Sequence, residues 1–205
     1  MGTKLRLMMA VFAAMCLALA VGCSDDDEQI TSQRSDIVRF LTSTHVPRLV
    51  AEEDKESSLE AEPPFYEKLN QDLYRYVANY YDSNRSSRTM VDKGDQVSLT
   101  YTAYIFRGGM PRVDNVYISN DTAVISQLKQ AGLNAEYWSA EPLVVTLGES
   151  NIIKGVSQSL VGCRQGDQVE VYMTFEEAYE DKVVGIVPHK SAVAWFYTID
   201  AVVKK

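Results

Sequence analysis

Histidine and cysteine are scarce in this chain, which has two histidines and three cysteines among 205 residues. The histidines, His45 and His189, lie far apart in the sequence and have no carboxylates around them at the spacing of metal ligands. The sequence also lacks the order of serine, histidine and aspartate that a hydrolytic triad shows. These shortages argue against a metal centre and against a triad hydrolase, and they favour a function that needs neither.

Long apolar runs are also few, and the clearest one lies at the N-terminus. Lys4 and Arg6 precede an almost uncharged run at residues 7–22, which ends in small residues followed by Cys23. This pattern is typical of a secretory signal peptide and is too short for a good transmembrane span. Its end resembles the lipobox of bacterial lipoproteins, in which the cysteine is acylated. We therefore predict a lipoprotein signal peptide at 1–22 and lipidation at Cys23, with an ordinary signal peptide as the alternative.

A serine and four acidic residues follow the cysteine, in the segment Ser24–Glu28. A polar, acidic run of this kind suits a flexible tether, which we place at residues 23–32. A serine and acidic residues after the lipidated cysteine also resemble the signal that sends Bacteroidetes lipoproteins to the outer face of the outer membrane. The sequence therefore predicts an outer-membrane lipoprotein, on the periplasmic face or at the cell surface, and favours the surface.

One cysteine, Cys163, remains after signal cleavage and lipidation, so the mature chain cannot form an intramolecular disulfide. Acidic residues outnumber basic ones by 28 to 20, and loss of the two positive charges of the signal changes the formal net charge from −8 to −10. An acidic protein without a basic patch is a poor candidate for binding nucleic acid or anionic lipid. Membrane attachment is therefore expected to rest on the acyl chains of Cys23.

Two patterns in residues 33–89 predict a helical N-terminal extension. Ser35 precedes apolar residues that fit a short capped helix ending before Pro47. Pro63 and Pro64 then precede apolar residues that recur every three or four positions, which favours a second helix. The apolar stripe on this second helix can pack on the rest of the chain or pair two chains into a homodimer. It consists of Phe65, Leu69, Leu73, Tyr76, Val77 and Tyr80.

From Gln96 onward the apolar period changes to two residues, which predicts strands with one buried face. One more helical segment is expected between Asn120 and Gly132, and glycine turns separate several of the strands. This order predicts an α+β domain of antiparallel strands and short helices over residues 90–205. The strands are expected at 97–105, 143–147, 169–173 and 193–199.

The same domain carries motifs that resemble the FKBP-type peptidyl-prolyl cis-trans isomerases. The most informative are Ile152-Ile-Lys-Gly155, a turn that leads into a short helix, and the segment Leu160–Asp167, whose glycine turn precedes a new strand. The resemblance covers residues 90–205 and implies an antiparallel half-barrel wrapped around a short helix. The other matching segments are 94–103, 142–148, 178–179, 187–188 and 193–203.

An isomerase of this kind needs no nucleophile, metal or cofactor. Rotation about an Xaa-Pro bond breaks amide resonance and crosses a barrier of about 18–20 kcal/mol. Because the twisted transition state is less polar than the planar amide, an apolar pocket that excludes water can favour it, while a few donors hold the substrate. The expected partners are proline-containing peptides or unfolded exported proteins.

The resemblance also implies which residues form the pocket. In the family, the second isoleucine donates its backbone N–H to the substrate and a loop tyrosine donates its hydroxyl, which points here to Ile153 and Tyr179. Core packing is the alternative for most pocket residues, but Tyr179 stands in an acidic stretch that we expect to be a solvated loop. The remaining positions are Tyr101, Tyr117, Leu143, Val145, Ile152, Val156 and Trp195, with Val156 as the floor.

Three features depart from the pattern of the family. Val156 stands where a tryptophan usually forms the floor, and Ile118 replaces the aspartate that normally follows the pocket aromatic residue. Leu143 and Tyr117 stand where phenylalanines are common. An insert at 119–141 has a position from which it could overhang the pocket. We therefore consider two functions: a lipid-anchored isomerase that helps exported or surface proteins fold, and a catalytically degenerate module that binds a peptide or protein.

Overall fold

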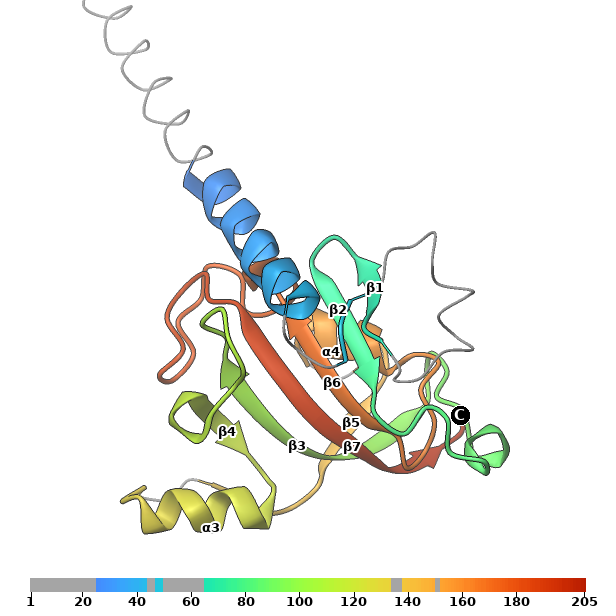
Figure 1. The fold of residues 1–205 in the computed structure, drawn as a ribbon. Coiled ribbons are helices and arrows are strands. Elements are labelled where there is room, and N and C mark those ends of the chain that lie inside the picture. Colours follow the sequence, from blue (N-terminus) through green and yellow to red (C-terminus); the bar gives the residue numbers. More distant parts are fainter. Residues whose placement is uncertain (1–24, 44–46, 50–64, 134–137, 150–151) are drawn as a thin grey trace, which may run out of the picture.

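A curved antiparallel sheet wraps around one short helix in the part of the chain that the computed structural model describes, residues 25–43, 47–49, 65–133, 138–149 and 152–205 (Figure 1). The predicted signal peptide and lipidated cysteine lie outside these residues. The strands follow the order β1-β2-β6-β7-β3-β4, and β5 pairs with β3. The α+β half-barrel is therefore confirmed. Its elements are β1 (Glu67–Asn70), β2 (Leu73–Val77), β3 (Gln96–Ile105), β4 (Val116–Ser119), α3 (Thr122–Gln130), β5 (Leu143–Thr146), α4 (Lys154–Leu160), β6 (Gln168–Met173) and β7 (Val193–Val203).

The two longest strands, β3 and β7, form the centre of the sheet. They pair from Gln96 opposite Val203 to Ile105 opposite Val193. Buried and less buried residues alternate along the first half of β3, as the period of two predicts. The strands expected from this period are present as β3, β5, β6 and β7, and α3 lies where the helical insert was predicted.

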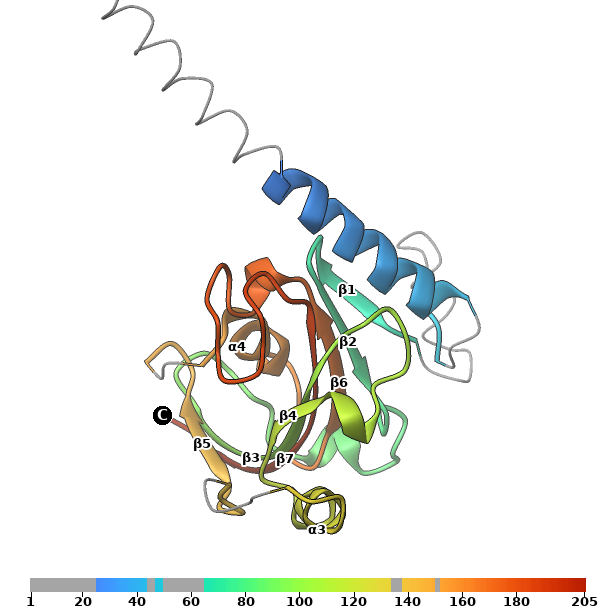
Figure 2. The same cartoon turned by 90° about the vertical axis from the view of Figure 1, so that its left-hand side faces the viewer.

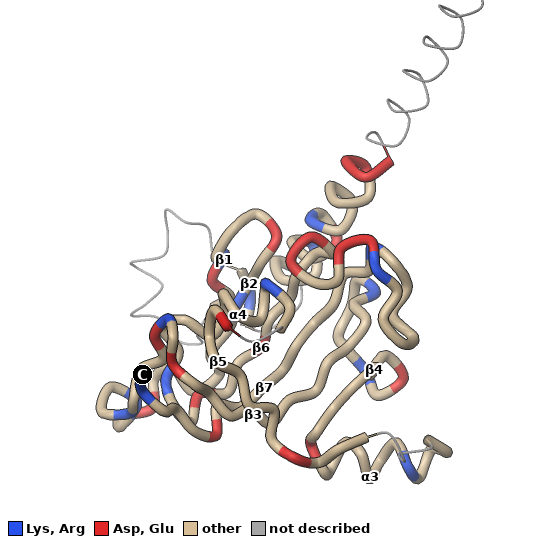
Figure 3. Tube along the Cα trace, turned by 180° about the vertical axis from the view of Figure 1, so that it is seen from behind, with Lys and Arg blue, Asp and Glu red and all other residues tan. Residues whose placement is uncertain are grey.

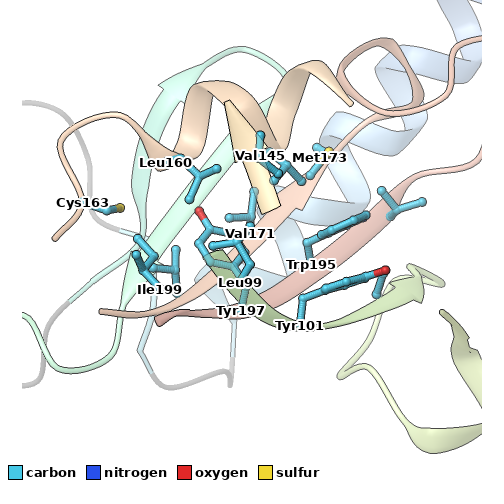
Figure 4. Packing of buried hydrophobic residues seen from close by; sticks show 14 of the residues in the cluster. Leu99, Tyr101, Val145, Leu160, Cys163, Val171, Met173, Trp195, Tyr197 and Ile199 are labelled. Atoms are coloured by element: carbon cyan, nitrogen blue, oxygen red, sulfur yellow. The ribbon is translucent and has the colours of Figure 1, made fainter. Parts of the chain in front are cut away.

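Helix α4 fills the concave side of the sheet, as Figure 2 shows. Its Val156 and Leu160 are fully buried and belong to one cluster with Leu99 of β3 and Val171 of β6 (Figure 4). Each fully buried aliphatic side chain of this kind stabilises the fold by about 1.5–3 kcal/mol. Cys163 lies in the same cluster, where burial raises its pKa to about 11. Its thiol therefore stays protonated and is poorly reactive.

The segment after Pro64 forms two strands, so the helix predicted from its apolar spacing is wrong. Strands β1 and β2 make a hairpin, and β2 pairs with β6 along its whole length. In β2, Leu73 is buried in the concave core and its neighbour Tyr74 in a cluster on the outer face. A surface helix buries only one stripe, whereas a strand packed on both faces buries all its residues. The sheet therefore begins before residue 90, and residues 33–89 are not a separate helical extension.

One long helix, residues 25–42, packs on the outer face of the sheet (Figure 1). Ile37 and Leu41 are fully buried there. The helix predicted after Ser35 is therefore present but begins earlier. No helix in the described ranges is long and apolar enough to cross a membrane. The aromatic residues in or against this outer cluster are Phe40, Tyr66, Tyr74, Tyr76, Tyr104, Phe106, Tyr172 and Phe196.

The flexible tether predicted at residues 23–32 is wrong from residue 25 onward, where the chain is helical. Asp26 forms an ion pair with Lys190, and the side chain of Gln29 donates to the Lys190 carbonyl at 3.0 Å. Contacts of this kind order a segment whose composition alone favours disorder.

A largely buried arginine, whose side chain is 12% exposed, connects the β1-β2 hairpin to the central helix. Arg75 of β2 pairs with Glu67 of β1 at 2.7 Å, and its Nη1 donates to the carbonyls of Ser159 at 2.9 Å and Val161 at 2.8 Å. These carbonyls lie at the C-terminal end of α4, where carbonyl groups lack partners within the helix. The hairpin therefore completes both the sheet and the helix end, and it belongs to the same structural unit as residues 90–205.

Replacing Arg75 by methionine is expected to lower the free energy of unfolding by about 3 kcal/mol, because Glu67 and two helix carbonyls lose a buried donor. Urea denaturation followed by fluorescence measures this change. Lys68→Met is the matched control, since Lys68 is exposed on β1; it should change stability by less than about 0.5 kcal/mol. Equal stability of Arg75→Met and the wild type would contradict the role assigned to Arg75.

Candidate active site

The structure brings all nine predicted pocket residues together on the concave side of the sheet. Four of them are buried members of the core cluster, and five are half-buried and pack against it. The half-buried residues are the ones that a ligand can reach. The buried set is Tyr101, Val145, Val156 and Trp195, and the half-buried set is Tyr117, Leu143, Ile152, Ile153 and Tyr179.

An aromatic pair forms a flat apolar surface in this group. The rings of Tyr101 and Trp195 are stacked, with centroids 4.6 Å apart and an interplanar angle of 7°, and Figure 4 shows them lying parallel. Ala103 of β3 lies opposite Trp195 of β7, so the two aromatic residues are diagonal neighbours on one face of the sheet. An indole is thus present in the pocket, although it comes from β7 and not from α4, where Val156 stands.

Three side chains form a chain of hydrogen bonds beside this surface. The indole Nε1 of Trp195 donates to the hydroxyl of Tyr117 at 2.7 Å, and the hydroxyls of Tyr117 and Tyr179 are 3.0 Å apart. An indole N–H can only donate, so the Tyr117 oxygen accepts from it, and the Tyr117 O–H can donate a hydrogen bond to the Tyr179 oxygen. This arrangement leaves the O–H of Tyr179 available for a carbonyl group of a ligand.

Both tyrosine hydroxyls remain protonated at neutral pH. Burial raises the pKa of Tyr117 well above its usual value, and the nearby Tyr179 adds to the shift. Burial also raises the pKa of Tyr179, against a smaller opposing effect of the hydrogen bond with Tyr117. The pair therefore offers neutral donors rather than a titrating acid or base.

Tyr179 lies on the loop between β6 and β7, and this loop folds back on itself. The loop begins with the short 3-10 helix Phe175–Glu177. The N–H of Glu180 donates to the carbonyl of Phe175 at 2.8 Å, and the N–H of Lys190 donates to the carbonyl of Glu180 at 3.0 Å. Glu180 itself has a φ of 55°, in the left-handed region that a sharp reversal of the chain requires. These bonds fix the backbone next to Tyr179.

Glu177 is buried at the start of this loop, so the prediction of a solvated acidic loop is wrong at this residue. It is 4% exposed, and its carboxylate accepts from Lys154 at 2.9 Å and from Asn70 at 3.1 Å. A buried carboxylate is tolerated when it is paired in this way. Its partners come from α4 and from the β1-β2 hairpin, which are distant in sequence, so no local pattern signals the contact.

Close packing requires a glycine at position 155, two residues after the isoleucine pair. A Cβ atom at this position would lie 2.6 Å from the sulfur of Met173 and 3.0 Å from the carbonyl oxygen of Glu177. Real Cβ atoms do not approach so closely, so only glycine lets α4 pack this tightly against the start of the loop. This close approach brings the first turn of α4 near Tyr179.

The isoleucine pair lies at the N-terminal end of α4, with Ile153 as its N-cap residue. The carbonyl of Ile153 accepts the first helical hydrogen bond, from Ser157 at 3.1 Å. No residue in the described ranges accepts a hydrogen bond from the Ile153 N–H. Backbone N–H groups at a helix start are suited to a ligand oxygen.

Tyr117 provides the polar contact to Tyr179 that the apolar side chain of Ile118 cannot provide. Ile118 is 40% exposed and lies opposite Ala103 of β3, and the register shifts between this pair and Tyr104–Val116, so Tyr117 is the extra residue of a β-bulge. The Tyr117 hydroxyl therefore supplies the polar partner of Tyr179 from the aromatic ring itself.

The insert helix α3 does not overhang the pocket. Asp121 and Val124 line a hollow of about 260 Å³ together with Thr100, Thr102 and Phe196. Phe196 belongs to the outer cluster, so this hollow lies on the opposite face of the sheet from Trp195. Helix α3 therefore lies on the outer side of the sheet and does not cover the concave side.

Comparison with protein families agrees with this geometry. Residues 87–197 match the family model described as FKBP-type peptidyl-prolyl cis-trans isomerase, which covers more than half of the chain. No curated protein matches the sequence. The N-terminal helix and the β1-β2 hairpin lie outside the matched residues, although both pack on the same sheet.

Replacing Gly155 by alanine is expected to lower the free energy of unfolding by about 2 kcal/mol, because the new methyl group overpacks the contact with Met173 and Glu177. Thermal or urea denaturation measures the loss. Gly109→Ala is the control, since a Cβ at Gly109 meets no atom within 4 Å. A Gly155→Ala protein as stable as Gly109→Ala would show that α4 and the loop do not pack as closely as described.

Proposed function

Since the chain belongs to the FKBP-type peptidyl-prolyl cis-trans isomerase family, we propose that it accelerates the cis–trans isomerisation of Xaa-Pro bonds in exported proteins. We further propose that it does so at the outer membrane, on the periplasmic face or at the cell surface, anchored by acyl chains on Cys23. The apolar N-terminal run that ends in small residues and Cys23 supports this location.

One observation carries the proposal: the Tyr179 hydroxyl is held by Tyr117 beside the stacked rings of Tyr101 and Trp195. The half-buried apolar residues that pack beside these rings, Leu143 and Ile152 among them, can contact a proline ring. The Tyr179 O–H and the Ile153 N–H can then hold carbonyl groups of the peptide on either side of the rotating bond. Because the twisted amide is less polar than the planar one, a dry aromatic surface favours the transition state over the ground state.

Typical interaction energies indicate which effect would contribute most to the rate enhancement. Each tenfold acceleration requires about 1.4 kcal/mol of additional transition-state stabilisation. A single hydrogen bond from a neutral donor contributes about 1 kcal/mol, so two donors account for only part of a large acceleration. Most of the rate enhancement must therefore come from the exclusion of water by the aromatic residues and from the orientation of the peptide.

A second candidate is a module that binds proline-containing peptides without accelerating their isomerisation. The fully buried Val156 favours this alternative, because the family usually has a tryptophan at that position of α4. The two candidates differ in one measurement. A mature chain that binds an Xaa-Pro peptide but leaves its isomerisation at the uncatalysed rate would support the binding module.

Tyr179→Phe is expected to lower kcat/KM for a proline peptide about tenfold, because the substrate carbonyl loses a donor worth about 1–1.5 kcal/mol. Tyr117→Phe should lower it by a smaller factor, since it removes only the group that orients Tyr179. Exchange NMR on a peptide series measures both. Tyr80→Phe serves as the control, since Tyr80 is 38% exposed and lies outside the pocket. Equal rates for Tyr179→Phe and Tyr80→Phe would remove Tyr179 from the mechanism.

The rate is expected to be constant from about pH 6 to pH 9. Tyrosine has an ordinary pKa of about 10, and burial raises the pKa of Tyr117 and Tyr179 further. Both therefore stay in the neutral, donating form throughout this range, and loss of activity should begin only at higher pH. Measurement of kcat/KM across the range tests this. A transition near pH 7 would point to a titrating group that the pocket residues named here do not include.

A further inference from the structure

The loop that carries Tyr179 is contacted from outside the family match, by the helix at residues 25–42. We propose that Gln33 of this helix is a positioning residue, which holds both ends of the loop and so places the Tyr179 hydroxyl for the substrate. The consequence for catalysis rests on the function proposed above. The hydrogen bonds from Gln33 to the two ends of the loop, which we call the brace, do not depend on that function.

A single side-chain amide joins the two ends of the loop. The Gln33 Oε1 accepts the N–H of Phe175 at 2.9 Å, and its Nε2 donates to the carbonyl of Lys190 at 2.7 Å. Phe175 opens the loop after β6, and Lys190 lies shortly before β7. Because an amide side chain is both a donor and an acceptor, glutamine can make this bridge without leaving a buried charge.

Other residues of the same helix contact the same two ends of the loop. At the start of the loop, Arg34 binds both carboxylate oxygens of Asp72 at 2.8 and 2.7 Å. Asp72 in turn accepts from the hydroxyl of Thr174 at 2.8 Å. At the end of the loop, Lys190 receives the contacts of Asp26 and Gln29 described above. The helix therefore contacts the loop at both of its ends, next to Phe175 and at Lys190.

Hydrogen bonds and an ion pair at Lys190 link the helix to the end of the loop. A cavity of about 360 Å³ lies in the seam, lined among others by Gln33, Asp36, Pro188 and Lys190. The cavity leaves part of this seam unpacked, and the polar contacts of Gln33 link the two parts beside it. Figure 3 shows the acidic residues of the loop lying near the lower end of the described helix.

Release of the loop ends is expected to disturb Tyr179 more than the rest of the pocket. The other aromatic members of the site lie on strands β3, β4 and β7 and are held by the sheet. Tyr179 alone among them lies on the loop, and its place depends on the loop backbone and on the contact with Tyr117 at 3.0 Å. A small displacement of a catalytic group from its position removes much of its contribution to the reaction rate.

The first test compares Gln33→Ala with two controls in the mature chain. Gln33→Ala is expected to lower kcat/KM about fivefold. Leu41→Ala shortens a fully buried residue on the same helix, about 12 Å further along; it should lower stability but leave kcat/KM unchanged. Gln130→Ala, at the exposed end of α3, should change neither. Gln33→Glu keeps the acceptor for Phe175 and should fall between Gln33→Ala and the wild type.

Hydrogen exchange provides a readout that does not depend on activity. Gln33→Ala should speed exchange of the Phe175, Glu180 and Lys190 amides at least tenfold relative to the wild type. Amides of β3 should exchange at unchanged rates, whereas Leu41→Ala should leave the loop amides protected. Unchanged exchange at these three amides in Gln33→Ala would overturn the inference. A wild-type protein that is inactive, with exchange faster in Gln33→Ala, would reject the proposed function and retain the brace.

Discussion

The close approach of α4 to the start of the Tyr179 loop is the contact on which the site depends. It is possible only because residue 155 is a glycine, since a side chain there would collide with Met173 and with the Glu177 backbone. Glu177 then turns its carboxylate to Lys154 on the first turn of the same helix. One close contact thus joins the helix that begins after Ile153 to the start of the loop that carries Tyr179.

The aromatic residues show how a pocket can keep its chemistry while its members change. A tryptophan is absent from α4, yet Trp195 supplies an indole from β7 and stacks on Tyr101. The aspartate after the pocket aromatic residue is absent too, and the hydroxyl of Tyr117 contacts Tyr179 in its place. Both substitutions keep an apolar surface with a neutral donor at its edge, which is the combination that the proposed isomerase activity needs.

Much of the fold could be predicted because the informative patterns are local. Alternation along β3 and β7 and the turn at Ile152–Gly155 follow from short-range geometry. The hairpin at residues 67–77 was mistaken for a helix because its apolar residues also recur at helical spacing, and only pairing with β6 decides between the two. The brace at Gln33 and the burial of Glu177 could not be predicted, since their partners lie far away in the sequence and polar side chains carry no periodicity.

The sequence by itself determined the strands expected at 97–105, 143–147, 169–173 and 193–199, and the resemblance carried by its motifs implied the side chains that form the pocket. Each of these depends on the identity of a residue and its near neighbours. Only the tertiary structure decided that the N-terminal helix lies on the sheet and holds the Tyr179 loop, and that Trp195, Tyr117 and Tyr179 share one chain of hydrogen bonds. Such contacts form when distant segments are brought within about 3 Å, and the packing of the whole chain sets that distance.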